Sequence, residues 1–86
     1  MNKRSTVNIA QVVGLDLGDR HCQIVALDRE SGEIVERSRV RTTAAALRSR
    51  FAGVAPLRIA LEVGTHSPWI SRLLAELGDE VFVANA

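Results

Sequence analysis

The run of residues 11–17, QVVGLDL, predicts a strand at the centre of a sheet. Apolar side chains fall on both of its faces, a pattern typical of a strand that is covered on both sides. Gly18 and Asp19 then indicate a turn, and residues 21–28, HCQIVALD, predict a second strand. Asp16 is therefore an anomaly, because it places a carboxylate within an otherwise apolar central strand.

The segment that follows predicts a hairpin and a helix. Residues 28–32, DRESG, indicate a turn, and residues 33–40 alternate charged and apolar side chains like a more exposed third strand. The hydroxyl pair Thr42-Thr43 offers a cap for a helix that is expected to stop at Gly53. The apolar positions at helical spacing in this segment are Ala44, Leu47 and Phe51.

The last third of the chain predicts a strand, a helix and a strand. Residues 57–63, LRIALEV, form an apolar strand with Glu62 near its carboxyl end. The pair Ser67-Pro68 predicts an N-cap followed by the first helical residue, and Gly78 ends this helix. Its apolar stripe comprises Trp69, Ile70, Leu73, Leu74 and Leu77. Residues 80–84, EVFVA, predict the fifth strand.

This order of elements predicts an α/β fold with one mixed five-stranded sheet and two crossover helices. Helical crossovers join parallel neighbours, whereas tight turns join antiparallel ones. The spatial order 3-2-1-4-5 satisfies both conditions, and it is the ribonuclease H-like arrangement. Strand one then lies beside strand four. Asp16 and Glu62 are therefore expected near the same ends of adjacent strands.

Length and composition limit the class of protein. The 86 residues make one domain, with residues 1–10 as a flexible tail and residues 11–86 as the folded part. No apolar run approaches the roughly 18 residues of a membrane helix, and the single cysteine, Cys22, fits a reducing compartment. We therefore expect a cytoplasmic protein without a membrane segment. The net charge of +1 neither demands nor excludes nucleic acid.

Asp16 and Glu62 are the candidate chemical groups. An ionised carboxylate in a buried strand is costly unless pairing, hydrogen bonding or a metal compensates it. Two converging carboxylates repel each other, and a divalent cation such as Mg²⁺ or Mn²⁺ turns this repulsion into binding. Two structural roles stay open: Asp16 as a cap of the turn at Gly18, and Glu62 as the partner of Arg58 or Arg72.

Two longer stretches resemble a known family. Residues 13–35, VGLDLGDRHCQIVALDRESGEIV, and residues 58–86, RIALEVGTHSPWISRLLAELGDEVFVANA, are similar to the N-terminal RuvC-like domain of the DEDD transposases of the IS-one-ten insertion-sequence family. These transposases are prokaryotic recombinases guided by a bridge RNA. The first stretch is weakly specific, because RuvC resolvases and actin-like kinases open similarly. The second is more specific, since Glu62 is followed by GTHSPW and a leucine-rich helix.

The resemblance implies an activity and partners. Asp16 and Glu62 match the first two acidic residues of the family's tetrad, so they would be catalytic and would bind Mg²⁺ or Mn²⁺ for DNA strand cleavage and transfer. DNA, a guide RNA and a homo-oligomeric intact enzyme are implied as well. The other two aspartates and the C-terminal serine-nucleophile domain have no counterpart in these 86 residues. We therefore expect a recombinase fragment that is inactive alone.

Two other classes of protein remain open. An actin-like ATPase or sugar kinase has a similar Asp-Leu-Gly turn around a phosphate, but here the acidic Asp19 follows at the place of the phosphate. A non-catalytic interaction domain would keep the fold and the carboxylates without the chemistry.

Several further side chains have a structural and a functional interpretation. His66 either contacts substrate near Glu62 or packs at the start of the second helix. Trp69 either packs in the core as part of the apolar stripe or stacks on a base, and Cys22 is expected in the core. An arginine strip at period two either holds phosphates or keeps an edge strand from pairing, and its members are Arg37, Arg39 and Arg41.

Overall fold

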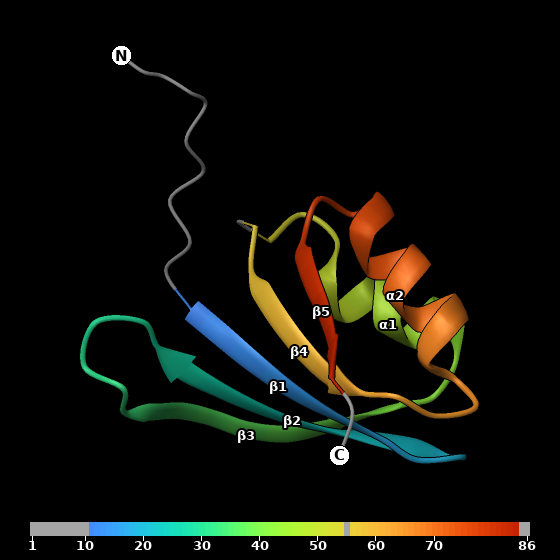
Figure 1. Cartoon of the computed structure of the whole chain (residues 1–86), viewed down its shortest axis with the longest axis horizontal. Helices are drawn as coiled ribbons and strands as arrows, with labels where there is room; N and C mark the ends of the chain where they lie inside the picture. The colour runs from blue at the N-terminus through green and yellow to red at the C-terminus, as the bar shows by residue number, and fades with distance from the viewer. Residues whose placement is uncertain (1–10, 55, 85–86) are drawn as a thin grey trace.

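A computed structural model of the chain describes residues 11–54 and 56–84, and the tail expected at residues 1–10 lies outside them. Within the described residues, five strands and two helices form an α/β fold (Figure 1). The strands are β1 (Gln11–Leu17), β2 (His21–Asp28), β3 (Ile34–Arg41), β4 (Arg58–Glu62) and β5 (Glu80–Ala84). The helices are α1 (Ala44–Phe51) and α2 (Ser67–Glu76).

The sheet has the expected order, β3-β2-β1-β4-β5. β1 and β2 pair antiparallel, as do β2 and β3, whereas β1 with β4 and β4 with β5 pair parallel. The mixed five-stranded topology is therefore confirmed. The bounds of β1, β2 and β5 agree with the sequence patterns, β3 lies one residue further along the chain, and β4 is shorter at both ends.

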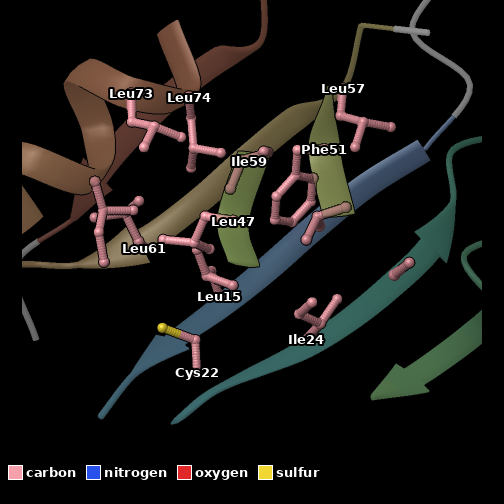
Figure 2. Packing of buried hydrophobic residues seen from close by; sticks show 13 residues of the cluster. Leu15, Cys22, Ile24, Leu47, Phe51, Leu57, Ile59, Leu61, Leu73 and Leu74 are labelled. Carbon is pink, nitrogen blue, oxygen red and sulfur yellow. The ribbon is translucent and has the colours of Figure 1, made fainter. Parts of the chain in front are cut away.

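Both helices pack against the same face of the sheet. Val13 and Leu15 of β1 share one hydrophobic core with residues of α1 and α2. Figure 2 shows Leu47 and Phe51 reaching from α1 toward the strands, close to Leu15 and Ile59. The core also contains Cys22, as expected, and this side chain is fully buried.

Among the described residues, no helix covers the other face of the sheet. On β1 the residues between the core positions are half-buried or exposed, and Gly14 and Asp16 belong to the exposed ones. Neither described helix lies on this side (Figure 1). Within residues 11–54 and 56–84, the expectation that β1 is covered on both faces is thus wrong, because both described helices pack on one face. We call this side, which carries Val12, Gly14, Asp16, Gln23, Val25, Ala60 and Glu62, the open face.

The turn between β2 and β3 forms as predicted. Asp28 Oδ1 accepts hydrogen bonds of 2.9 Å from the backbone N–H groups of Glu30 and Ser31. These bonds stabilise the carboxylate and lower the pKa of Asp28. Gly32 completes the turn with a φ of 76°, a conformation that glycine adopts without strain.

Helix α1 begins at the predicted cap. The Thr43 side chain accepts a 3.1 Å hydrogen bond from the backbone N–H of Ala46, as an N-cap residue does. The helix buries Leu47 and Phe51. Ala44, expected on the same stripe, is instead exposed, since it lies in the first turn and away from the sheet.

Helix α2 differs from prediction at its first residue. The N-cap position is held by His66, and Ser67 is already helical. The Ser67 hydroxyl donates to the Gly64 carbonyl over 2.8 Å and accepts from the Gly64 N–H over 3.1 Å. The hydroxyl therefore closes the loop after β4 instead of capping the helix. Ile70, Leu73 and Leu74 are buried as predicted, whereas Trp69 and Leu77 are only partly buried.

In the described part of the chain, neither α1 nor α2 has the length and apolar character that crossing a membrane requires.

Candidate functional site

Asp16 and Glu62 lie at the same level on adjacent parallel strands. The register pairs Leu15 of β1 with Leu61 of β4, and the two acids are the next residues along each strand. Neighbouring strands are about 4.8 Å apart. Both side chains also line the same two hollows of the surface. The structure thus brings together the two carboxylates that the sequence singled out.

Both carboxylates are exposed, because they belong to the open face. The free-energy cost of burying an ionised carboxylate therefore does not apply to Asp16 and Glu62. Within residues 11–54 and 56–84, neither the Asp16 nor the Glu62 carboxylate takes part in an ion pair or accepts a hydrogen bond. The two neighbouring carboxylates therefore have no ion-pair partner among the described residues.

The two structural roles left open for these acids are not observed. The turn after β1 is closed by the Gly18 N–H, which donates to the His21 carbonyl over 3.1 Å. Arg58 forms its ion pair with Glu80, at 2.7 Å, across β4 and β5. In the part of the chain that the structure describes, Asp16 does not cap the turn, and Glu62 forms an ion pair with neither Arg58 nor Arg72.

A hollow of about 180 Å³ lies at the carboxyl ends of β1 and β4. We call it the carboxylate hollow, and its lining residues are Asp16, Leu17, Asp19, Glu62, Val63, Gly64, Thr65 and His66. It combines three carboxylates with one imidazole. A second hollow of about 370 Å³ extends from Asp16 and Glu62 over the open face, and its lining includes Gly14, Gln23, Val25, Ala60 and Ala84. We call it the sheet hollow.

A chain of hydrogen bonds runs along the rim of the carboxylate hollow. Trp69 Nε1 donates to His66 Nδ1 over 3.1 Å, and His66 Nε2 lies 3.2 Å from Asp19 Oδ1. The two rings meet edge to face at 88°. The sequence places Asp19 in the turn after β1, but no local signal indicates its contact with His66, because 47 positions separate the two residues.

The turn that carries Asp19 is held in place by Thr42. The Thr42 hydroxyl donates to the Gly18 carbonyl over 2.7 Å, and the Thr42 N–H donates to the Arg20 carbonyl over 2.9 Å. A Cβ on Gly18 would lie 2.5 Å from the His21 carbonyl oxygen. Only glycine therefore fits this turn without a shift of the backbone.

The arginine strip lies on the edge strand β3. Arg39 is paired with Gln23, and Gln23 is paired with Asp16, so one cross-strand row joins the arginine to the carboxylate. A third hollow of about 460 Å³, the arginine hollow, is lined by Gln23, Ile24, Val25, Arg37, Ser38 and Arg39. It shares Gln23 and Val25 with the sheet hollow. The two hollows therefore meet over β2.

The donor chemistry of the site fits Mg²⁺ or Mn²⁺ with an incomplete protein shell. Among the residues that the structure describes, no three His, Cys, Asp or Glu side chains come close enough to hold a metal ion together. Magnesium, however, is usually bound through one or two carboxylates, with waters and substrate phosphates completing its shell. Asp16 and Glu62 match that donor set.

The chain matches no model of a known protein family, and no curated protein is significantly similar to it. The geometry of the carboxylate site therefore carries the functional proposal, together with the resemblance of the two sequence stretches.

Proposed function

We propose that this chain is the N-terminal part of a metal-dependent DNA transposase or site-specific recombinase with a ribonuclease H-like fold. The observation that carries the proposal is the position of Asp16 and Glu62, adjacent and exposed at the carboxyl ends of neighbouring parallel strands. Open α/β sheets bind their ligands at these ends. Guide RNA and a homo-oligomeric intact enzyme belong to the proposal through the resemblance alone.

Asp16 and Glu62 would hold Mg²⁺ or Mn²⁺ in this function. When bound, the metal supplies Lewis-acid activation of the attacking oxygen and stabilisation of the leaving one. The two carboxylates offer hard oxygen ligands from two strands of one sheet, so their spacing is fixed by the ladder between β1 and β4. Their exposure leaves room for a phosphodiester to complete the metal shell.

The position of the arginine strip supports binding of the nucleic acid across the open face of the sheet. Guanidinium groups bind phosphates in a forked geometry, and Arg37 and Arg39 line a hollow that meets the sheet hollow over β2. A DNA strand that crosses the open face from the β3 side would therefore reach the carboxylates along the row of Arg39, Gln23 and Asp16.

The geometry of the first turn weighs against the kinase alternative. A phosphate-binding turn presents free backbone N–H groups, but the Gly18 N–H is used by the His21 carbonyl. The Asp19 carboxylate also extends from this turn, with 94% of the side chain exposed. We expect no ATP binding by calorimetric titration, and a saturable ATP site that Gly18→Ala weakens would favour the kinase class.

Binding of Mn²⁺ tests the proposal directly. The amount of free Mn²⁺, followed by its electron paramagnetic resonance signal, is expected to fall on addition of the protein. Asp16→Asn and Glu62→Gln should each abolish this effect. Glu80→Gln is the matched control, because it removes a carboxylate that is already paired with Arg58. Binding that survives both site substitutions would overturn the metal site and favour a non-catalytic interaction domain.

A further inference from the structure

The hydrogen bond from Trp69 selects one tautomer of His66. An indole N–H can only donate, so His66 Nδ1, 3.1 Å from Trp69 Nε1, must accept. The proton of the neutral imidazole then lies on Nε2. This N–H is directed at Asp19 Oδ1, 3.2 Å away.

His66 is well supported in this orientation. It occupies the N-cap position of α2, and Trp69 follows one helical turn later, so one short segment fixes both rings. The His66 side chain is only 27% exposed. Its position on the wall of the carboxylate hollow places it on the same concave surface as Asp16 and Glu62.

Asp19, in contrast, is a weakly held partner. Its side chain is 94% exposed, and exposed pairs of this kind contribute little because water competes for both groups. The carboxylate can rotate into solvent without breaking any packing. The Nε2–H of His66 therefore has an acceptor that another oxygen can replace.

We propose that His66 is a substrate-binding residue that donates its Nε2–H to a phosphate oxygen of the nucleic acid, and that Asp19 occupies the place of this oxygen until substrate arrives. This inference rests on the proposed function, because it takes the phosphodiester as the ligand of the carboxylate hollow. Trp69 is a positioning residue, since it acts by fixing the tautomer and the ring of His66.

The tautomer is tested first, without any ligand. The nitrogen chemical shifts of the neutral His66 imidazole in a long-range ¹⁵N–¹H spectrum are expected to report the Nε2–H tautomer. Trp69→Phe keeps an aromatic ring and removes the indole donor, so it should shift the two nitrogen signals toward a mixture of tautomers. An Nδ1–H tautomer in the unmodified chain would overturn the inference.

Binding of a short fluorescent DNA duplex in the presence of Mg²⁺ tests the contact itself. His66→Phe removes the donor, and a loss of about three- to tenfold in affinity is expected for one hydrogen bond. His66→Gln keeps an N–H donor at similar reach and should recover most of that loss. Equal affinities for the unmodified chain, His66→Phe and His66→Gln would overturn the inference.

Substitution of Asp19 distinguishes displacement from simple repulsion. Asp19→Ala should tighten DNA binding, because the competing acceptor is gone. The gain should be smaller when His66 is already phenylalanine, and this difference measures the coupling of the two residues. Equal gains in both backgrounds would contradict the displacement.

Different results would overturn the inference about His66 and the proposed function. DNA binding that depends on Asp16 and Glu62 but not on the donor of His66 would leave the proposed function standing and overturn only the inference. An unmodified chain that binds no DNA in the presence of Mg²⁺ would overturn both.

Discussion

The hydroxyl of Thr42 donates a 2.7 Å hydrogen bond to the carbonyl of Gly18. This bond joins the start of α1 to the turn between β1 and β2, over 24 positions of sequence. The same hydroxyl lies 3.4 Å from the sulfur of Cys22 in the core. Thr42, which lies on the side of the sheet that carries the helices, thus holds the turn that borders the carboxylate hollow.

Replacement of Thr42 should therefore destabilise the fold. Thr42→Val keeps the shape of the side chain but leaves the Gly18 carbonyl without its partner, at an expected cost of about 1–3 kcal/mol in the free energy of unfolding. Thr42→Ser keeps the hydroxyl and should cost less. Urea denaturation of the three chains measures the difference. A larger loss for serine than for valine would show that packing of the methyl group matters more than the hydrogen bond.

Gly18 and Gly14 should respond in opposite ways to alanine. At Gly18 the added Cβ would lie 2.5 Å from the His21 carbonyl oxygen, and the forced shift of the turn should cost about 1–3 kcal/mol. At Gly14 the nearest atom would be 3.9 Å away, so alanine should be neutral or stabilise the strand by up to about 1 kcal/mol. Thermal unfolding of both variants provides the comparison. A Gly18→Ala variant as stable as Gly14→Ala would contradict the geometry of the turn.

The fold should tolerate the loss of both site carboxylates. Asp16 and Glu62 are exposed like charges on neighbouring strands, and cross-strand like charges are destabilising. The double variant Asp16→Asn, Glu62→Gln should match or exceed the metal-free stability of the unmodified chain, with the larger gain at low salt. Mg²⁺ should raise the melting temperature of the unmodified chain only. A double variant that fails to fold would make the two acids structural.

Asp79 should make stability depend on pH. Asp79 is only 9% exposed, and this burial raises its pKa, while the hydrogen bond from the Leu57 N–H, at 3.0 Å, opposes the rise. The folded state therefore binds the proton more tightly than the unfolded state. This contribution to stability is fully present below the ordinary aspartate pKa and is lost as pH rises through the raised value.

Two substitutions separate the charge of Asp79 from its hydrogen bond. Asp79→Asn keeps an acceptor for the Leu57 N–H. It should remove the decrease in the free energy of unfolding that occurs as pH rises through the raised pKa of Asp79. Asp79→Ala leaves the Leu57 N–H unpaired and should cost about 1–3 kcal/mol. Denaturation at a series of pH values checks both. An unchanged pH profile in Asp79→Asn would show that the burial of this carboxyl carries no penalty.

The arginine strip should control the salt dependence of DNA binding. If Arg37 and Arg39 each neutralise a phosphate, each alanine substitution should lower the slope of log affinity against log salt by about 1. Arg72→Ala is the control, because Arg72 is an exposed residue of α2, on the other side of the sheet. Equal slopes for strip and control variants would remove the strip from the proposed nucleic-acid path.

Most secondary structure could be predicted because it depends on local physics. The apolar runs of β1, β2 and β5, the Thr43 cap and the glycines after the two helices are signals within a few residues of the elements they define. The placement of Ser67 was missed, since its hydroxyl bonds back to Gly64. The Ser67 hydroxyl thus finds its hydrogen-bond partners in the Gly64 backbone and not in the first turn of the helix.

The sequence also determined that Asp16 and Glu62 would be neighbours. The order of strands and helices leaves few topologies once crossovers and hairpins obey their usual geometry, and the observed register of β1 with β4 agrees. Their chemical role stays a prediction. The arginine strip was likewise predictable as a set, because alternate residues of a strand share a face.

Only the tertiary structure decided which face of the sheet is open and which side chains meet there. β1 has apolar residues on both faces, so hydrophobic periodicity could not show that α1 and α2 cover the same side. The contact of Asp19 with His66 and the pairing of Arg58 with Glu80 join residues that are 47 and 22 positions apart. Such contacts depend on how the elements pack, since the hydrophobic effect is non-directional and selects burial but not a particular polar partner.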